Sequence, residues 1–261
     1  MFLGTAIDFP AGDGNGYDVT TPANLAGGAG WAFTSLMWLN LDTLNDSRRW
    51  YRKSGNLNLQ NAFADTNDVA FSVGRATTGA DAVSSDNFFT AGKWWFVACT
   101  YDESDGPRIF HGDLTTTVVE ASSYATRDVG SGDTVSTSSD DLNLGYRASL
   151  SRTLDGRVAY YHFIDARLSL GQIKGLQFQS ARAVANTQIL MYPGIDGSVT
   201  TITDYSGNGN DAAQVGTGQA VGVGPGALSR WGEEVAFGTV TAAVPSIIPQ
   251  IMHHRKQLVG V

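Results

Sequence analysis

The sequence predicts an all-β protein, built as a two-sheet antiparallel sandwich or jelly roll with one short helix. Short segments of β-branched and aromatic residues recur at near-regular spacing, separated by turns rich in Gly, Asp and Asn. Helix-forming Glu and Lys are scarce, whereas turn-forming residues are abundant. The 261 residues suffice for one large β domain or two small ones.

Residues 94–100 form the clearest strand, because they are aromatic and β-branched and lie between turns at 91–93 and 102–106. Residues 107–111 resume as the second strand of a hairpin. A helix over 94–101 fits less well, since the segment is short and its apolar residues fill both faces. We expect the side chains of Trp94, Phe96 and Ala98 on one face of this strand. Those of Trp95, Val97 and Cys99 are expected on the opposite face.

The remaining elements follow in chain order. Residues 31–41 carry bulky groups on both faces and predict a second interior strand. Further strands are expected at 4–9, 18–20, 48–52, 56–64, 69–74, 115–124, 142–146, 156–164 and 189–192. Residues 77–87 and 127–141 are expected to be loops. The helix is expected near 169–180, because Ser169 and Gln172 have the spacing of a capping box.

The chain is expected to divide near residue 215. Residues 1–215 hold the predicted strands and helix, whereas 216–261 begin with the Gly-rich stretch GTGQAVGVGPG. The apolar pieces 235–244, 247–248 and 251–252 that follow are too few to bury a second core. We therefore expect 216–261 to be a linker and an extended arm that folds back or covers a neighbouring protein in an assembly.

Charge and cysteine content exclude several classes of protein. The formal net charge of −8 argues against general binding to the phosphate backbone of nucleic acid, but it does not exclude a local basic patch. No apolar run approaches the length of a membrane span, and no signal peptide is expected at the N-terminus. Cys99 is the only cysteine, so no intrachain disulfide can form. This pattern fits synthesis in a reducing compartment, and Cys99 is expected to be a buried apolar residue.

Four segments carry a family resemblance. In chain order they are TAIDFPAGDGNGYDV, WAFTSLMWLNL, AGKWWFVACTYD and GRVAYYHFIDARLSLGQI. Their order and motifs closely resemble the laminin-G-like, concanavalin A-like jelly-roll superfamily of lectins and glucanases, over roughly residues 1–215. The segment LMYPGIDGSVTTITDYSGNGNDA is also similar to a piece of these domains. That piece usually precedes the first strand, whereas here it follows the helix. The resemblance implies a fold, and functions on that fold vary.

Catalytic motifs are not found. Retaining glycosidases need two carboxylates about 5 Å apart. The glucanase branch of the family that the chain resembles places them in E-x-D-x-x-E or a close variant on one strand, and this sequence has no such motif. Two aspartates could take the place of the glutamates, but the adjacent Asp140 and Asp141 would point to opposite faces of an extended chain. A G-x-S-x-G elbow is also lacking, and none of the four histidines has a triad-like setting. We expect a protein that is not an enzyme.

Calcium is the one cofactor that the sequence suggests. Many members of the family that the chain resembles hold Ca²⁺ with Asp and Asn side chains at the sandwich edge, and hard oxygen ligands in loops suit that ion. The candidates are Asp13, Asn15 and Asp18 in one loop and Asp204, Asn208 and Asn210 in another. The alternative is that these residues form Asx turns without a metal.

Glycan binding would use an aromatic platform with amide and carboxylate groups nearby. Trp31, Trp50 and Tyr51 are the candidates for the platform, with Tyr124 and Tyr146 also available. The alternative is that these rings lie in the core, where most aromatic residues of β proteins are found.

Three functions are compatible with these observations. The first is a non-catalytic structural or decoration component of a tailed-phage virion, made in the host cytoplasm and placed on the virion surface. Its partners would be other virion or assembly proteins, including copies of itself. The second is a glycan-binding or adhesion module of a cellular protein, which could be extracellular. The third is a glucanase-like hydrolase, which the missing carboxylate motif disfavours.

Overall fold

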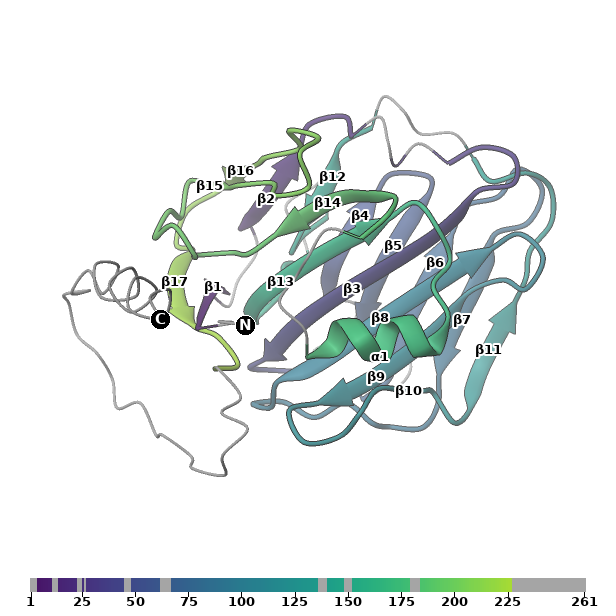
Figure 1. Ribbon diagram of the computed structural model, residues 1–261, viewed down its shortest axis with the longest axis horizontal. Helices are drawn as coiled ribbons and strands as arrows, with labels where there is room; N and C mark the ends of the chain where they lie inside the picture. Colours follow the sequence, from purple (N-terminus) through teal and green to yellow (C-terminus); the bar gives the residue numbers. More distant parts are fainter. Residues whose placement is uncertain are drawn as a thin grey trace, which may run out of the picture. The chain divides into compact units, whose positions relative to one another are not determined.

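The computed structural model describes residues 4–10, 14–22, 25, 27–44, 48–61, 67–135, 140–147, 152–178 and 184–226. The chain divides into two units, residues 1–228 and 229–261, and every described residue belongs to the first. That unit confirms the predicted sandwich, because its strands form two antiparallel sheets (Figure 1).

One of the two sheets has eight strands. Its path is β10-β9-β8-β3-β13-β1-β17, and β14 also pairs with β13. Strand β13 is long enough for β1 to pair with its first part and β14 with its second. The strands are β1 (Thr5–Phe9), β3 (Ala32–Leu41), β8 (Trp95–Asp102), β9 (Arg108–Asp113), β10 (Val119–Glu120), β13 (Gly156–Ile164), β14 (Thr187–Met191) and β17 (Ala220–Val223).

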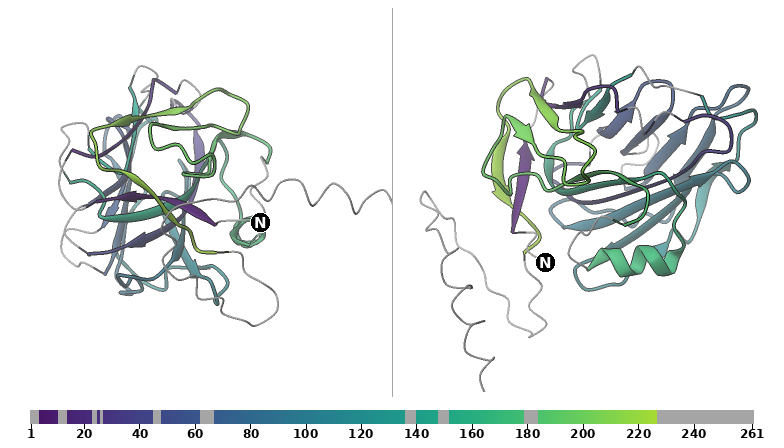
Figure 2. Two further views of the ribbon diagram at one scale, coloured as in Figure 1. Left: turned by 90° about the vertical axis from the view of Figure 1, so that its left-hand side faces the viewer. Right: turned by 45° about the horizontal axis from the view of Figure 1, so that its top comes forward.

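The nine-stranded sheet has the order β11-β7-β6-β5-β4-β12-β2-β16-β15. It packs against the first sheet, and its strands are seen from a second side in Figure 2. They are β2 (Gly16–Val19), β4 (Arg49–Lys53), β5 (Leu57–Asn61), β6 (Val69–Val73), β7 (Ala80–Ser84), β11 (Tyr124–Asp128), β12 (Leu142–Leu144), β15 (Thr201–Ile202) and β16 (Ala212–Val215).

The side chains of strand β8 point alternately to the two faces of its sheet, and both faces are apolar. Trp95, Val97 and Cys99 lie in the core between the two sheets. Phe96 and Ala98 lie on the other side of the same sheet, in a second apolar cluster against which Trp94 packs. The predicted sides of this strand are therefore confirmed. Both faces of the strand are buried, which explains its nearly continuous apolar sequence.

The helix α1 (Leu170–Gln177) covers the outer side of the eight-stranded sheet (Figure 1). The predicted capping box is confirmed, since the Ser169 side chain accepts from the backbone N–H of Gln172 and the Gln172 side chain accepts from the backbone N–H of Ser169. Ile173 and Leu176 face the second apolar cluster. The sheet is thus enclosed on one face by the other sheet and on the opposite face by the helix.

His162 on β13 is buried, and its hydrogen-bond partners among the described residues are neutral. Its Nδ1 lies 2.6 Å from the hydroxyl oxygen of Tyr160, and its Nε2 lies 2.8 Å from Oγ1 of Thr187. Burial lowers the pKa of His162 to about 4. The imidazole is therefore neutral in the folded protein at pH values where it binds a proton in the unfolded chain.

This difference predicts acid sensitivity. His162 stabilises the fold fully above about pH 6.5, and its contribution is lost as the pH falls towards 4, because only the unfolded chain readily takes up the proton. We expect a loss of about 3 kcal/mol in the free energy of unfolding over that range. Urea unfolding at several pH values measures it, and His162→Gln should lack this part of the slope. Equal slopes in the two proteins would contradict the prediction.

Two expected elements differ in the structure. The expected loop at 77–87 contains β7, whose inward residues Ala80, Ala82 and Ser84 are small. Ala and Ser are not typical strand residues, so the sequence of this segment did not predict a strand. In the structure these small side chains fit against neighbouring large residues. The single strand expected at 115–124 is instead two strands in different sheets, β10 and β11.

The folded unit also extends beyond the boundary expected at residue 215. Strand β17 pairs with β1 along four residues, from Thr5 opposite Val223 to Asp8 opposite Ala220. Its side chains Val221 and Val223 are largely exposed, as at a sheet edge. The glycines of this stretch concealed a strand, because Gly is usually depleted in strands. The expected arm beyond it, residues 227–261, lies outside the described residues.

Candidate functional site

A pocket of about 400 Å³ lies beside the start of α1, on the outer side of the eight-stranded sheet. Strands β9 and β10 form one wall, because Phe110 is directly opposite Glu120 in their register. The segment that enters α1 forms the other wall. The lining residues are Arg108, Phe110, Glu120, Arg167, Leu168, Ser169 and Leu170.

The pocket combines an apolar floor with a charged rim. Phe110 and Leu168 are buried in the second apolar cluster, and Leu170 packs against it. Arg108, Glu120 and Arg167 each leave about a third of the side chain exposed, at 27%, 31% and 29%. A concave site with apolar walls and a few convergent polar groups is the usual form of a small-ligand site.

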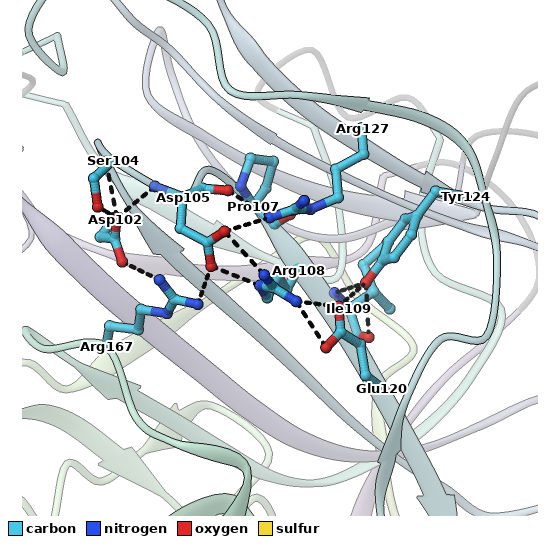
Figure 3. Close-up of polar contacts among 10 residues, drawn as sticks. All are labelled: Asp102, Ser104, Asp105, Pro107, Arg108, Ile109, Glu120, Tyr124, Arg127 and Arg167. Atoms are coloured by element: carbon cyan, nitrogen blue, oxygen red, sulfur yellow. Dashed lines mark hydrogen bonds and ion pairs between the residues drawn. The ribbon is translucent and has the colours of Figure 1, made fainter.

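Arg108 holds two carboxylates at the rim (Figure 3). Its Nη1 lies 2.7 Å from Oε1 and 2.9 Å from Oε2 of Glu120. Its Nε and Nη2 donate to the carboxylate of Asp105, at 2.7 and 2.9 Å. Such paired bonds between a planar guanidinium and a carboxylate fix both groups in orientation.

The network continues to the turn after β8. Arg167 donates to both Asp102 and Asp105, and Arg127 donates to Asp105 (Figure 3). Asp102 also accepts from the backbone N–H and hydroxyl of Ser104. Four segments distant in sequence are therefore joined at this edge, which holds the pocket rim in place.

The network keeps its aspartates ionised. Hydrogen bonds from Arg108, together with those from Arg167 and Arg127, hold the pKa of Asp105 well below its usual range. Burial raises the pKa of Asp102, but bonds from Ser104 and Arg167 outweigh it and bring the pKa to about 2. Neither group can donate a proton near neutral pH, whereas a glycosidase acid needs a raised pKa. The rim can orient a polar ligand but these aspartates cannot serve as its acid.

This pocket could not be predicted from the sequence. Arg108 lies on β9, Glu120 on β10 and Arg167 in the segment before α1, and none belongs to a recognised motif. Only one contact of the rim could be inferred from neighbouring residues: Asp105 and Arg108 are three residues apart across a turn, a spacing that allows an ion pair. The remaining contacts depend on strand register and on where α1 begins.

The expected aromatic platform lies in the core instead. Trp50 and Tyr51 are fully buried, and Trp31 is 8% exposed and stacks on Phe33. Trp50 packs against Phe89 and donates to Oδ1 of Asn61. These three rings therefore cannot stack on a glycan in this structure, and the core alternative is correct.

The first expected calcium loop is only partly described. Asp13 lies outside the described residues. Oδ1 of Asn15 accepts from the backbone N–H of Thr217 at 3.2 Å. Oδ1 of Asp18 accepts from the Asn143 amide at 2.7 Å and from the Tyr146 hydroxyl. The described residues of this loop thus bond to other parts of the chain.

The second loop is organised around Asp204. Its carboxylate accepts from the backbone N–H groups of Leu190, Ser206 and Asn210 at 2.9 Å each. The side-chain amides of Asn208 and Asn210 both donate to the carbonyl of Gln188. These bonds pin the loop to β14 and match the Asx-turn alternative.

Within the described ranges, no three His, Cys, Asp or Glu side chains are grouped to hold a metal ion. Backbone carbonyls and Asn side chains are also calcium ligands. Calcium binding at the two loops stays a prediction. Among the described residues, no helix has the length and apolar character needed to cross a membrane.

Comparison with known proteins bears on the fold. The family described as the concanavalin A-like lectin/glucanases superfamily matches residues 12–174. No curated protein sequence matches the chain. A solved structure of a candidate carbohydrate-binding protein from Bacteroides ovatus is similar with a TM-score of 0.60 and 14% identity. That likeness covers 85% of this chain, which spans 60% of the Bacteroides ovatus protein.

Two further solved structures are less similar. A heptameric pentraxin from Limulus polyphemus has a TM-score of 0.47 and 12% identity, covering 85% of this chain and 95% of its own. The CBM40 of a Ruminococcus gnavus sialidase, bound to sialyllactose, has a TM-score of 0.44 and 13% identity. It covers 67% of this chain and 99% of its own.

Proposed function

We propose, from the premise that the chain belongs to the concanavalin A-like lectin/glucanase superfamily, that it is a non-catalytic carbohydrate-binding domain. The pocket beside α1 is the proposed binding site. The observation that carries the proposal is the combination of an apolar floor at Phe110 with the oriented carboxylate of Glu120 and guanidinium of Arg108.

These groups suit a sugar. A pyranose ring presents apolar C–H groups on its faces and hydroxyl groups around its edge, so it needs both kinds of surface. The carboxylate of Glu120 can accept from sugar hydroxyls while Arg108 holds it in place. A volume of about 400 Å³ is that of a small-ligand site. The name of the Bacteroides ovatus protein is compatible with this proposal.

The absence of catalysis is part of the proposal. The sequence lacks the glucanase carboxylate motif, and Asp105 next to the pocket remains ionised under its arginines. A bound glycan would therefore be released unchanged.

A glycan array followed by calorimetry on the best-bound oligosaccharide tests this proposal. Glu120→Gln keeps the shape of the side chain but removes its charge, and it should weaken binding about tenfold or more. Asp128→Asn is the matched control, since Asp128 is an exposed carboxylate on β11 outside the pocket lining. It should leave the affinity unchanged.

Two results would overturn the proposal. Absence of binding to every glycan, or binding that Glu120→Gln leaves intact, would remove the pocket as a carbohydrate site. Cleavage products in the incubated oligosaccharide, lost in Glu120→Gln, would show an enzyme. A place on a tailed-phage virion surface stays a prediction, and its test is whether the protein is found in purified particles.

A further inference from the structure

The charges at the rim of the α1 pocket balance one another (Figure 3). Among the described residues, the network joins three guanidinium groups to three carboxylates, and each group bonds to at least one of the opposite charge. They are Arg108, Arg127 and Arg167, with Asp102, Asp105 and Glu120. Arg108, Glu120 and Arg167 are the charged residues among those that line the pocket. The network that frames the pocket therefore carries no net formal charge.

Asp105 is the centre of this balance, although the pocket is lined by other residues. Its carboxylate accepts from Arg108 at 2.7 and 2.9 Å, from Arg127 at 2.9 Å, and from Arg167. The two guanidinium groups that line the pocket are thus paired with the same carboxylate. Hydrogen bonds from Arg108, and then from Arg167 and Arg127, hold the pKa of Asp105 well below its usual range. Asp105 therefore keeps its charge near neutral pH.

A charged ligand would disturb the balance. A carboxylate or sulfate group on a sugar would need a guanidinium group, and those of Arg108 and Arg167 already bond to Asp105. The ligand anion would either displace that carboxylate or lie close to it, and like charges at such distances repel each other. A ligand cation would meet the same difficulty beside the arginines. An uncharged ligand avoids both costs.

Capacity for hydrogen bonds nevertheless remains at the rim. Each carboxylate oxygen has two lone pairs, and the described donor to Oε2 of Glu120 is Nη1 of Arg108, at 2.9 Å. A guanidinium group has five N–H groups, and Arg167 uses Nη1 and Nη2 for Asp102 and Asp105. The side chains of Glu120 and Arg167 are 31% and 29% exposed, so a ligand in the pocket can reach them. Sugar hydroxyls fit this arrangement, because each of them both donates and accepts.

We propose that the α1 pocket takes an uncharged saccharide and that Asp105 sets this preference by neutralising Arg108 and Arg167. The inference rests on the proposed function, since it concerns the same pocket. Asp105 is a positioning residue, which acts on the ligand through the two arginines that line the pocket. Saccharides that carry sialic acid, uronic acid or sulfate groups are disfavoured by their charge rather than by their size.

A glycan array of matched pairs tests the preference. Each pair consists of a neutral glycan and its sialylated, sulfated or uronic-acid form, so the two members differ in charge on a common core. We expect the natural protein to bind the neutral members, and calorimetry on the best-bound pair gives both affinities. The affinity for the neutral glycan should change less than about twofold between about 0.05 and about 0.5 M NaCl, because that ligand brings no charge to be screened.

Asp105→Asn tests the role of Asp105. It keeps the shape of the side chain but removes one negative charge from beside the arginines. The affinity for the acidic member relative to the neutral member should therefore rise about threefold or more. Asp128→Asn is the matched control, because it makes the same change of charge on the exposed strand β11 and should leave this ratio unchanged. If Asp105→Asn does not fold, Asp102→Asn removes the same charge from beside Arg167, and the ratio should rise as well.

Three results would overturn the inference. Binding of the acidic members alone, altered by Glu120→Gln and not by Asp128→Asn, would do so and leave the proposed function standing. A ratio of affinities that Asp105→Asn leaves unchanged would show that Asp105 supports only the shape of the rim. Absence of binding to every glycan would remove the proposed function itself, and this inference with it.

Discussion

Phe96→Ala is expected to lower the free energy of unfolding by about 3–5 kcal/mol. Phe96 is fully buried on the outer side of β8, where its ring lies 5.4 Å from that of Trp38. The change removes a large apolar group from beneath α1 and leaves a cavity that the two-sheet framework cannot close easily. Urea unfolding followed by tryptophan fluorescence measures the effect.

Phe178→Ala is the matched control. Phe178 follows α1 and is 41% exposed, so its truncation should change the free energy of unfolding by less than about 1 kcal/mol. Equal stability of Phe96→Ala and the natural protein would show that β8 is not packed on this side.

Gln177→Leu is expected to cost on the order of 3 kcal/mol or more, although it removes no volume. The side chain of Gln177 is 1% exposed and joins α1 to the hairpin of β9 and β10. Its Nε2 donates to the carbonyls of Asp113 and Thr116, at 2.9 and 2.8 Å. Its Oε1 accepts from the backbone N–H of Val118 at 2.6 Å. Leucine would remove all three bonds, and of the three backbone groups the carbonyl of Thr116 would keep the backbone N–H of Asp113 as a donor at 3.2 Å.

Hydrogen exchange gives the local readout for this variant. The amide of Val118 should lose protection in Gln177→Leu, while the amides of β13 keep theirs. Gln188→Leu is the control, because its amide makes one exposed bond to the carbonyl of Asn186. Unchanged stability and unchanged protection at Val118 would contradict the prediction.

Strands with large side chains on both faces could be predicted from the sequence. Residues 94–100 could be assigned with their sides, because aromatic and β-branched residues at every position fit a strand buried on both faces. The helix could also be predicted, since Ser169 and Gln172 form a local signal that does not depend on tertiary contacts. Strand β7 was missed because its inward residues are small and give no apolar periodicity.

The sites could not be predicted, for a different reason. Trp50 and Tyr51 are adjacent, so regular alternation would expose one of them. The register of β4 shifts between Arg49 and Tyr51, and both rings point into the core. Arg49, which lies on the other side of this register shift, is opposite Gln60 on the outer face of the sheet. A bulge depends on the partner strand, and a single sequence does not show it.

The pairing of β1 also fixes when the protein can finish folding. Strand β1 leaves the ribosome well before its two neighbours, β13 and β17, which come from much later in the chain. Until they are made, both edges of β1 lack partners and are open to other strands. Pairing over such long sequence separations is slow, and it cannot proceed step by step during synthesis. Release of residues 220–223 from the ribosome therefore sets the earliest moment at which the eight-stranded sheet can close around β1.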